Sequence, residues 1–265
     1  MTGLAFGLLR RLPPSLSERA ISKFIMPRLN GTSIPVKTRD GFSIWCSPSD
    51  FIQNTIIRTG MWDYEVADAI RSHLRPGQTF CDIGANIGYF SMLAAQLGAH
   101  VIAFEPQPLC ASAFRRNANL NNLNITLHEI ALSNEPGQMN LYLEGDQNTG
   151  AASFRVRDGV AISVPVKRLD DILTVKPHLM KIDIEGAEVL ALRGAKQTLS
   201  GAGRPFVICE VSECSLRQLG NSKEELFDLM TSYGYQADVI SKVRRSNSST
   251  NSVYFQYDAL FTPIN

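Results

Sequence analysis

Residues 79–90 read TFCDIGANIGYF, and this stretch decides the fold. An apolar run ends in Asp82, a glycine-bounded loop runs from Gly84 to Gly88, and the apolar-periodic segment YFSMLAAQLG follows directly. This order predicts a buried strand, a tight loop and the start of a helix. Glycines let a ligand approach the main chain, and the first amides of a helix have no intrahelical partner. The stretch therefore predicts a small-molecule site between strand and helix.

A second predicted strand, residues 100–104, is followed by Glu105 and Pro106, and Glu105 comes 17 residues after Gly88. An acidic residue at the end of the second strand, about twenty residues past a glycine loop, is placed to accept hydrogen bonds from a ribose diol. The ligand is therefore expected to contain a nucleoside. The residues predicted to bind it are Asp82, Gly84, Asn86, Gly88, Glu105 and Pro106.

The spacing of the loop separates two classes of nucleoside ligand. A dinucleotide fingerprint, G-x-G-x-x-G, needs a middle glycine where this chain has Asn86. Asp82 would repel phosphates, but it suits an amino group close to a sulfonium. These residues favour S-adenosylmethionine over NAD as the cofactor. An NAD-dependent oxidoreductase and a non-catalytic protein that retains the fold are the alternatives.

Carboxylates lie at the ends of two further predicted strands, Asp183 and Glu185 at the end of residues 179–184 and Glu210 near the end of residues 204–213. Asp183 and Glu185 would point to the same side of the chain if it stays extended. Methyl transfer needs an acceptor aligned with the S–CH₃ bond and a group that removes its proton. Asp183 is expected to orient the cofactor's amino group or the acceptor, and Glu185 or Glu210 to act as the base. Alternatively these three carboxylates could hold Mg²⁺, or Glu185 and Glu188 could charge the first turn of the next helix.

From residue 76 onward, predicted strands alternate with helices at residues 88–97, 108–120 and 223–236. Such alternation predicts an α/β fold with a Rossmann-like, doubly wound sheet and a ligand at the carboxyl ends of its strands. Residues 124–132 are expected to form the third strand. Residues 137–166 have strand-like alternation and predict an inserted strand group, in which residues 145–153 form either a substrate loop or a solvent loop.

Five segments resemble the FkbM-type methyltransferases, a branch of the class I S-adenosylmethionine-dependent enzymes. They are DIGANIGYF, AFEPQP, EIALS, VPVKRLDDIL and KIDIEGAEVLALRGA, and the resemblance covers roughly residues 55 to 215. It implies a seven-stranded, mostly parallel sheet with a reversed last strand, and a helix before the first core strand that closes over the site near Trp62, Tyr64 and Glu65. It also assigns Ile130, Ala131 and Leu132 to the adenine.

The same resemblance implies that the methyl group goes to a hydroxyl oxygen of a sugar or another secondary metabolite. N-methylation of a small amine or of a protein is the alternative. The expected partner is thus a small-molecule acceptor, such as a sugar or a glycosylated metabolite.

Residues 1–75 are interpreted as an N-terminal extension and residues 76–265 as the methyltransferase domain. Residues 15–29 have helical apolar spacing and predict an amphipathic helix that packs on the domain or, as an alternative, lies on a membrane surface. Residues 33–46 predict a hairpin around Arg39, Asp40 and Gly41, and residues 62–74 a helix. The apolar run in residues 1–12 is too short for a membrane span, and its arginines lie on the wrong side for a signal peptide.

Composition sets the remaining bounds. The chain has 265 residues, of which 44% are apolar, and a net charge of +1, which gives no reason to expect a nucleic-acid partner. Its five cysteines lack metal-type spacing and indicate free thiols in a cytoplasmic protein. Residues 242–252 are basic and polar, and predict a solvated loop. The sequence carries no indication of the oligomeric state.

Overall fold

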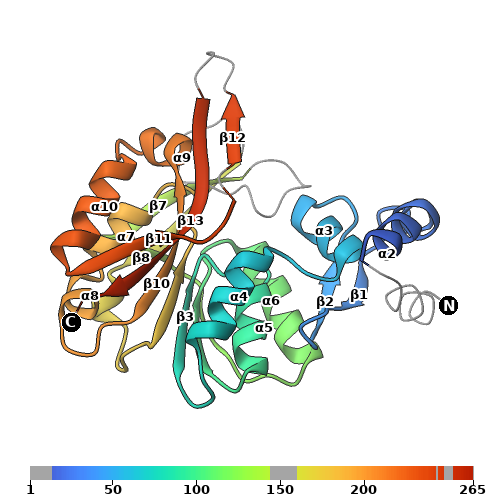
Figure 1. Cartoon of the computed structure of the whole chain (residues 1–265), viewed down its shortest axis with the longest axis horizontal. Helices are drawn as coiled ribbons and strands as arrows, with labels where there is room; N and C mark the ends of the chain where they lie inside the picture. Colours follow the sequence, from blue (N-terminus) through green and yellow to red (C-terminus); the bar gives the residue numbers. More distant parts are fainter. Residues whose placement is uncertain (1–13, 144–159, 243, 248–252, 265) are drawn as a thin grey trace.

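The computed structural model describes residues 14–143, 160–242, 244–247 and 253–264. Its central sheet has the strand order β11-β13-β10-β9-β3-β4-β5 (Figure 1). These strands are β3 (Thr79–Ile83), β4 (His100–Phe104), β5 (Thr126–His128), β9 (Leu179–Ile182), β10 (Phe206–Ser212), β11 (Tyr235–Val239) and β13 (Val253–Pro263). β13 is antiparallel to both of its neighbours, and the other adjacent pairs are parallel. The prediction of seven mostly parallel strands with a reversed last strand is confirmed.

The loop predicted for residues 242–252 is wrong in part. β12 (Arg244–Asn247) pairs antiparallel with β13 and adds an eighth strand to the sheet. Polar residues can form such a strand because the backbone of β13 supplies the pairing, and an edge strand needs no apolar face.

Helices cover both faces of the sheet, as the doubly wound prediction requires (Figure 1). One face carries α4 (Tyr64–His73), α5 (Tyr89–Gln96) and α6 (Pro108–Leu120), and the other carries α7 (Glu188–Arg193), α8 (Lys196–Ser200), α9 (Glu213–Gln218) and α10 (Lys223–Ser232). Successive strand residues point to opposite faces, so that Phe80 packs in one buried cluster and Cys81 in the other.

A separate three-stranded sheet contains β6 (Ala131–Leu132), β7 (Gly137–Leu143) and β8 (Val160–Lys167). The predicted inserted strand group is thus confirmed, although residues 145–153 lie outside the described residues. The strand predicted for residues 124–132 is confirmed only at Thr126–His128, where β5 pairs in parallel with β4, because the chain leaves the central sheet after His128. Ala131 and Leu132 pair in parallel with β8 instead, and Ala131 is buried there with Leu141 and Val164.

The N-terminal segment is helical, but not a single α-helix. α2 (Pro14–Ala20) continues as a π-helical turn, η1 (Ile21–Ile25), and a 3₁₀ turn, η2 (Met26–Arg28). Pro27 explains the change, because proline lacks an N–H and its ring clashes with the carbonyl four residues back. Ile21 is fully buried, whereas Leu16 and Phe24 are exposed. No helix in the described part of the chain is long and apolar enough to cross a membrane.

The predicted hairpin is confirmed as β1 (Ile34–Lys37) paired with β2 (Ser43–Cys46). The next helix, α3 (Phe51–Thr59), was not predicted, although its end signals are present. Asp50 caps it by accepting a hydrogen bond from the Gln53 amide at 2.9 Å. Gly60, at φ 83°, ends it.

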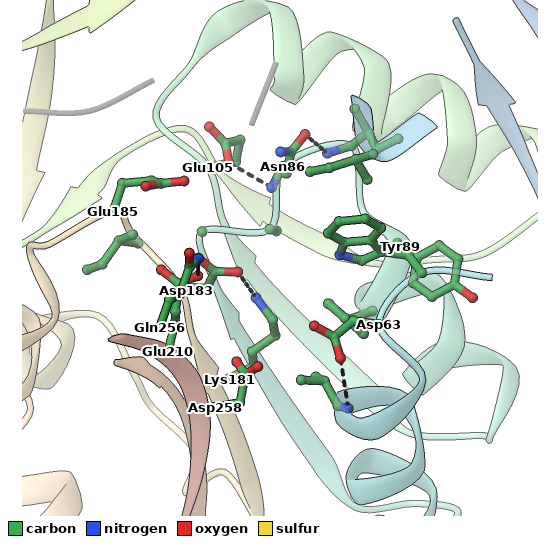
Figure 2. Close-up of a pocket in the computed structure, with 18 of the residues that line it drawn as sticks. Asp63, Asn86, Tyr89, Glu105, Lys181, Asp183, Glu185, Glu210, Gln256 and Asp258 are labelled. Atoms are coloured by element: carbon green, nitrogen blue, oxygen red, sulfur yellow. Dashed lines mark hydrogen bonds and ion pairs between the residues drawn. The ribbon is translucent and has the colours of Figure 1, made fainter. Parts of the chain in front are cut away.

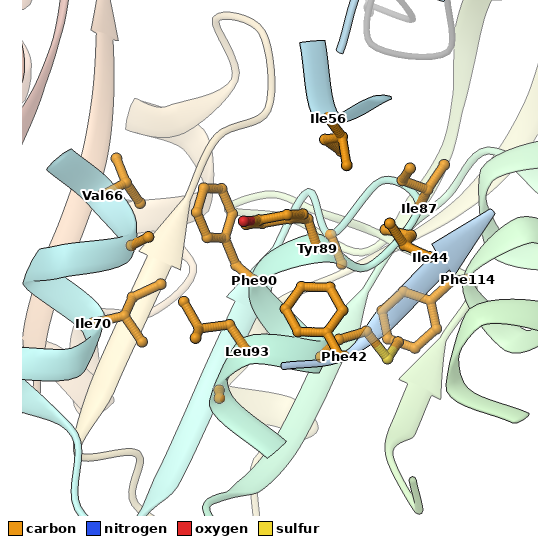
Figure 3. Packing of buried hydrophobic residues seen from close by; sticks show 14 of the residues in the cluster. Phe42, Ile44, Ile56, Val66, Ile70, Ile87, Tyr89, Phe90, Leu93 and Phe114 are labelled. Atoms are coloured by element: carbon orange, nitrogen blue, oxygen red, sulfur yellow. The ribbon is translucent and has the colours of Figure 1, made fainter. Parts of the chain in front are cut away.

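The extension and the sheet share one hydrophobic cluster (Figure 3). Phe42 and Ile44 of the hairpin region pack in the same cluster as Phe90 of α5 and Phe114 of α6. The division of the chain near residue 76 stays a prediction. Through this shared cluster the extension packs against the helices that cover one face of the sheet.

Candidate active site

A cavity of about 360 Å³ lies at the carboxyl ends of β3, β4 and β9 (Figure 2). This volume falls within the range of roughly 300–1,000 Å³ that is usual for small-molecule sites. The glycine loop and Glu105 form one wall, α3 and the start of α4 form another, and β13 contributes the floor with Lys181 and Glu210.

The glycine loop is held against β9 by steric necessity. Gly84 has φ +80°, and a Cβ built on it would lie 1.9 Å from the Asp183 carbonyl oxygen. Asn86 also has a positive φ, 51°, and its Oδ1 accepts a hydrogen bond from the Ile87 amide at 2.7 Å. Gly84 and Asn86 both line the cavity.

Gly88 was predicted to leave room for the ligand, but the structure shows that it leaves room for the Phe114 ring. A Cβ there would lie 2.7 Å from the Phe114 ring, and Gly88 is not among the described residues that line the cavity. Its missing side chain lets α5 pack closely on α6. We conclude that Gly88 supports the loop from behind.

Glu105 lines the cavity beside Pro106, and its side chain is almost fully buried. Its carboxylate accepts hydrogen bonds from the amides of Asn86 at 2.7 Å and Gln107 at 2.9 Å. Burial raises the pKa of Glu105 to about 7 in spite of these two bonds. Each carboxylate oxygen has a second lone pair, so Glu105 can still accept a hydrogen bond from a ligand.

Asp82 does not line the cavity, contrary to the direct contact that the sequence predicts. It is 1% exposed, and its Oδ2 accepts a hydrogen bond from the Ser91 hydroxyl at 2.6 Å. Its Oδ1 has no hydrogen-bond partner among the described residues, and burial raises its pKa. As a strand residue Asp82 points into the layer behind the glycine loop, so it can act on a ligand only through its neighbours.

Lys181 is the charged neighbour of Asp82, and it was not among the predicted site residues. Its Nζ lies 2.9 Å from Asp183 Oδ2, and the lysine is 3% exposed. Burial alone would lower the pKa of Lys181, but Asp183 and Asp82 more than offset this and raise it. Lys181 therefore stays charged and fixes the Asp183 carboxylate at the cavity wall.

Asp183 and Glu185 both line the cavity, but not in the way that an extended chain would place them. β9 ends at Ile182, and the chain then turns through Glu185 at φ 53° and Gly186 at φ 105°. The assumption of an extended chain is thus wrong. Glu188 holds this turn, because its Oε1 accepts hydrogen bonds from the amides of Ile184 and Gly186, both at 3.1 Å.

The helix-start interpretation applies to Glu188 and not to Glu185. Glu188 is the first residue of α7 and is 1% exposed, whereas Glu185 lies before the helix. Burial raises the pKa of Glu188 to about 7.

Glu210 also lines the cavity, from β10. Its Oε1 accepts a hydrogen bond from Gln256 Nε2 at 2.6 Å, and its Oε2 is buried without a partner among the described residues. Burial, followed by the charges of Asp183, Glu185 and Glu188, raises its pKa well above the usual value. Burial and these neighbouring carboxylates disfavour the ionised form of Glu210, which a base and a metal ligand both require, so neither predicted role of Glu210 is favoured.

The Mg²⁺ alternative is not supported either. Asp183, Glu185 and Glu210 share the cavity, but no three or more His, Cys, Asp or Glu side chains in the described part of the chain are grouped so that they could hold a metal ion.

The residues predicted to hold the adenine lie beside the large cavity. Ile130, Ala131 and Leu132 line a neighbouring space of about 10 Å³, which is separated from the large cavity by Gly84, Pro106 and Ile184. That volume is about the size needed for one water molecule. The structure thus brings these residues next to the site and not into it.

Among the residues of the extension that line the cavity, Phe51 and Asp63 were not predicted, whereas Trp62 was. Trp62 lines the cavity as expected, and its ring contacts Phe51 edge-on at 6.1 Å between centroids. Asp63 also lines the cavity, while its side chain accepts a hydrogen bond from the Val66 amide as the cap of α4. Tyr64 and Glu65, which were expected near the site, are not among the described residues that line it. The position of Asp63 just before a helix marks it as a helix cap, but no local pattern of the sequence places Asp63 or Phe51 at the cavity.

Asp258 of β13 is the second acidic group on the floor that the sequence did not reveal. It is 8% exposed, and the antiparallel register places it directly opposite Glu210. Burial, together with the charges of Asp63 and Asp183, raises its pKa to about 7. No sequence motif surrounds Asp258, and it reaches the cavity through the pairing of β13 with β10.

The sheet order, the glycine loop after β3 and the carboxyl groups at the strand ends define a Rossmann-like protein with a small-molecule site of the kind found in class I methyltransferases. Residues 82–237 match the family described as the methyltransferase FkbM domain. The match spans more than half of the chain, which therefore belongs to the FkbM methyltransferase family and is a methyltransferase.

The chain is also similar to several individual proteins. A methyltransferase of Beauveria bassiana is 30% identical over 191 residues, which cover 60% of this chain and 74% of the relative. The 31-O-demethyl-FK506 methyltransferase FkbM of Streptomyces tacrolimicus is 31% identical over 160 residues, which cover 46% of this chain and 61% of that enzyme. The solved FkbM methyltransferase of Methylobacillus flagellatus has a TM-score of 0.45 and 18% identity, over 78% of this chain and 52% of that one.

Proposed function

We propose that this protein transfers the methyl group of S-adenosylmethionine to a hydroxyl oxygen of a sugar or of another hydroxylated metabolite. The observation that carries the proposal is the buried carboxyl group of Glu105, which faces the cavity beside a glycine loop that tolerates no side chain at Gly84. The name of the Streptomyces tacrolimicus relative, which gives an O-demethyl compound as its substrate, supports transfer to oxygen.

The residues of the cavity fit this cofactor. Glu105 keeps a lone pair for a ribose hydroxyl, and Gly84 leaves the main chain open to a ligand. Pro106 lies on the boundary between the large cavity and the small space beside Ile130, where the adenine is expected. S-adenosylmethionine supplies an electrophilic methyl group on a positively charged sulfur, so no metal is required for the transfer.

The chain's own residues must then orient the acceptor and take up its proton. Asp183 is fixed by Lys181 at 2.9 Å and can accept a hydrogen bond from the acceptor hydroxyl or from the amino group of the cofactor. Glu185 remains a proposed base. Asp258 is a further candidate, because a pKa of about 7 lets it receive a proton near neutral pH.

An amine acceptor is the second candidate, and the acidic lining of the cavity is the observation that favours it. Carboxylates such as Asp63 and Asp258 would attract a protonated amine and could remove its proton before transfer. The described lining contains no unpaired basic side chain for a phosphorylated acceptor, since Lys181 is paired with Asp183.

We further propose that the protein acts in the cytoplasm. Its five cysteines are free, and Cys46, Cys81, Cys110 and Cys209 are buried. This arrangement suits a reducing compartment.

Calorimetric titration with S-adenosylmethionine, S-adenosylhomocysteine and NAD tests the proposal. We expect the two adenosyl ligands to bind and NAD not to bind. Glu105→Ala should weaken the binding of both adenosyl ligands by about 1–3 kcal/mol, because a buried hydrogen bond to the ribose is lost. Unchanged dissociation constants in a folded Glu105→Ala protein would contradict the role of Glu105. Matched hydroxyl and amino compounds as acceptors then separate the two candidate reactions.

A further inference from the structure

The N-terminal extension supplies an apolar wall to the large cavity. Its members are Phe51 and Ile52 at the start of α3, Trp62 just before α4, and Val66 in α4. Phe51 and Trp62 contact each other edge-on, with 6.1 Å between the ring centroids and 87° between the ring planes. The two rings therefore form a corner of aromatic surface, which we call the aromatic corner.

Phe51 is widely exposed for so large an apolar side chain, with 67% of its surface open to solvent. Single exposed apolar residues are ordinary on protein surfaces and need no explanation. Phe51 differs because it also lines the cavity and contacts the half-buried ring of Trp62. A side chain that lines a cavity and is still mostly exposed lies at the cavity's mouth, so the Phe51 ring is open to a ligand there.

The local backbone holds both rings in place. Phe51 is the first residue of α3 and directly follows Asp50, the side chain of which caps that helix. Trp62 lies in the short connection between α3 and α4, where the Met61 amide donates a hydrogen bond to the Thr59 hydroxyl at 3.1 Å. An aromatic side chain has only two χ angles, so little conformational entropy is lost when a ligand packs against it. The aromatic corner is thus pre-organised for binding.

Hydrogen-bonding side chains line the same cavity from β13 and from the chain just after β11. They are those of Ser241, Gln256 and Asp258. Gln256 donates one amide N–H to Glu210 at 2.6 Å, and a primary amide has a second N–H and a carbonyl oxygen as well. Figure 2 shows Gln256 and Asp258 on one side of this space and Asp63, the neighbour of Trp62, on the other. The cavity thus offers hydroxyl-binding groups in addition to an aromatic surface.

The contacts expected for the cofactor lie elsewhere. Gly84, Asn86, Glu105 and Pro106 belong to the wall formed by the glycine loop and the end of β4, and the adenine is expected beside Ile130. None of these residues comes from the extension or from β13. The aromatic corner therefore remains for the second ligand of the reaction, which is the methyl acceptor.

We propose that Phe51 and Trp62 form the acceptor subsite, and that they select an acceptor whose hydroxyl group is carried on a ring with an apolar face. The inference rests on the proposed function and adds the residues that choose the acceptor. A ring packs one face against the Phe51 ring, while the hydroxyl groups at its edge reach Gln256 and Asp258. Aromatic faces carry partial negative charge, which suits the C–H groups of a saturated ring or the edge of a second aromatic ring. An open-chain alcohol has no such face.

Saturation-transfer NMR on the full chain, with S-adenosylhomocysteine bound, tests the inference with simple probes. Methyl glucopyranoside is compared with open-chain glucitol, and cyclohexanol and phenol are compared with open-chain hexanol. We expect at least one ring probe to bind about threefold or more tightly than its open-chain counterpart. The ring that binds best shows whether the acceptor ring is a sugar, another saturated ring or a phenol.

Substitutions of Phe51 identify the subsite. Phe51→Ala should weaken the best ring probe by about three- to tenfold, and Phe51→Tyr should keep its affinity, because the aromatic face is restored. Both variants should bind S-adenosylhomocysteine as the unaltered protein does, which shows that they are folded. Tyr64→Ala is the matched control and should leave probe binding unchanged, since Tyr64 is 56% exposed but is not among the described residues that line the cavity.

Three results would overturn the inference while leaving the proposed function intact. The first is that no ring probe binds better than its open-chain counterpart. The second is that Phe51→Ala weakens S-adenosylhomocysteine as much as the ring probe, because the aromatic corner would then serve the cofactor. The third is an equal loss of probe binding in Tyr64→Ala. If S-adenosylhomocysteine does not bind to the folded, unaltered protein, the proposed function fails and the inference fails with it.

Discussion

At the scale of single residues, Gly84 cannot be replaced, because its backbone lies too close to the backbone of Asp183 for any side chain. We expect Gly84→Ala to lower the free energy of unfolding by about 3 kcal/mol or more and to abolish cofactor binding, because the new Cβ would collide with the Asp183 carbonyl oxygen. Gly220 is the control, since it has nearly the same φ, +78°, with no atom within 4 Å of its Cβ position.

Gly220→Ala therefore measures the cost of a positive φ alone, which is about 1–2 kcal/mol. Chemical denaturation of both variants gives the comparison. Equal losses would mean that backbone conformation, and not the contact with β9, makes Gly84 necessary.

Asp258 makes stability depend on pH. The folded protein holds the Asp258 proton up to about pH 7, whereas the ordinary value is 3.8. The folded state thus binds more protons in this window, and its stability falls as the pH rises through it. Relative to Asp258→Asn, the unaltered protein should lose about 1–3 kcal/mol between pH 4 and pH 8.

Denaturation curves of the two proteins across this range give the difference directly. Asp228→Asn, on the exposed side of α10 and away from the cavity, is the matched control for the same substitution outside the site. If the difference in free energy of unfolding between the unaltered protein and Asp258→Asn stays constant with pH, the raised pKa of Asp258 is contradicted.

At the level of elements, two asparagines of α6 tie the hairpin to the sheet. Asn117 accepts a hydrogen bond from the Trp45 amide at 2.9 Å and donates one to the Ile87 carbonyl of the glycine loop at 2.8 Å. Asn121 accepts a hydrogen bond from the Ser43 amide at 2.7 Å and donates one to the Ser43 carbonyl at 2.6 Å. Of these two asparagines, only Asn117 therefore connects β2 with the glycine loop.

We expect Asn117→Ala and Asn121→Ala each to lower the free energy of unfolding by about 1–3 kcal/mol, because buried backbone groups lose their partners. Only Asn117→Ala should also weaken the binding of S-adenosylmethionine, since it frees the loop at Ile87. Thermal unfolding and calorimetry on the same samples separate the two effects. If Asn121→Ala weakened binding as much, the loss would reflect general loosening of the hairpin.

Elements with strong local signals were predicted well, and those fixed by distant pairing were not. α6 was predicted with its observed bounds, because Pro108 starts it and its apolar spacing is regular. The predicted third strand was too long, because Ala131 pairs with β8, more than thirty residues later in the chain. The turn after β9 was missed because it depends on the side chain of Glu188, which bonds back to Ile184 and Gly186.

The same contrast applies to the candidate site. Glu105 and Gly84 lie in a motif whose spacing carries their chemistry, so they were found from the sequence. Asp258 and Asp63 reach the cavity through the register of β13 and the path of the extension, neither of which leaves a local pattern.

For the whole molecule, the open question is whether residues 76–265 are a domain in their own right. Phe42 and Ile44 of the hairpin region and Ile70 of α4 are fully buried in a cluster that also contains Phe90 and Phe114 of the sheet's helices. A fragment of residues 76–265 would expose this face. Each large apolar side chain returned to water costs about 1.5–3 kcal/mol, so the loss should exceed the stability of an ordinary domain.

We therefore expect the 76–265 fragment to lack a cooperative unfolding transition and to bind a hydrophobic dye, whereas a fragment of residues 14–265 should unfold cooperatively. Trp62, Asp63 and Val66 would be missing from the cavity wall as well, so adenosyl ligands should not rescue the shorter fragment. Circular dichroism during thermal unfolding, with and without S-adenosylmethionine, decides the matter. A sharp transition in the 76–265 fragment would mean that the extension is a separate cover over a self-sufficient sheet, and that the shared cluster adds stability without being needed for folding.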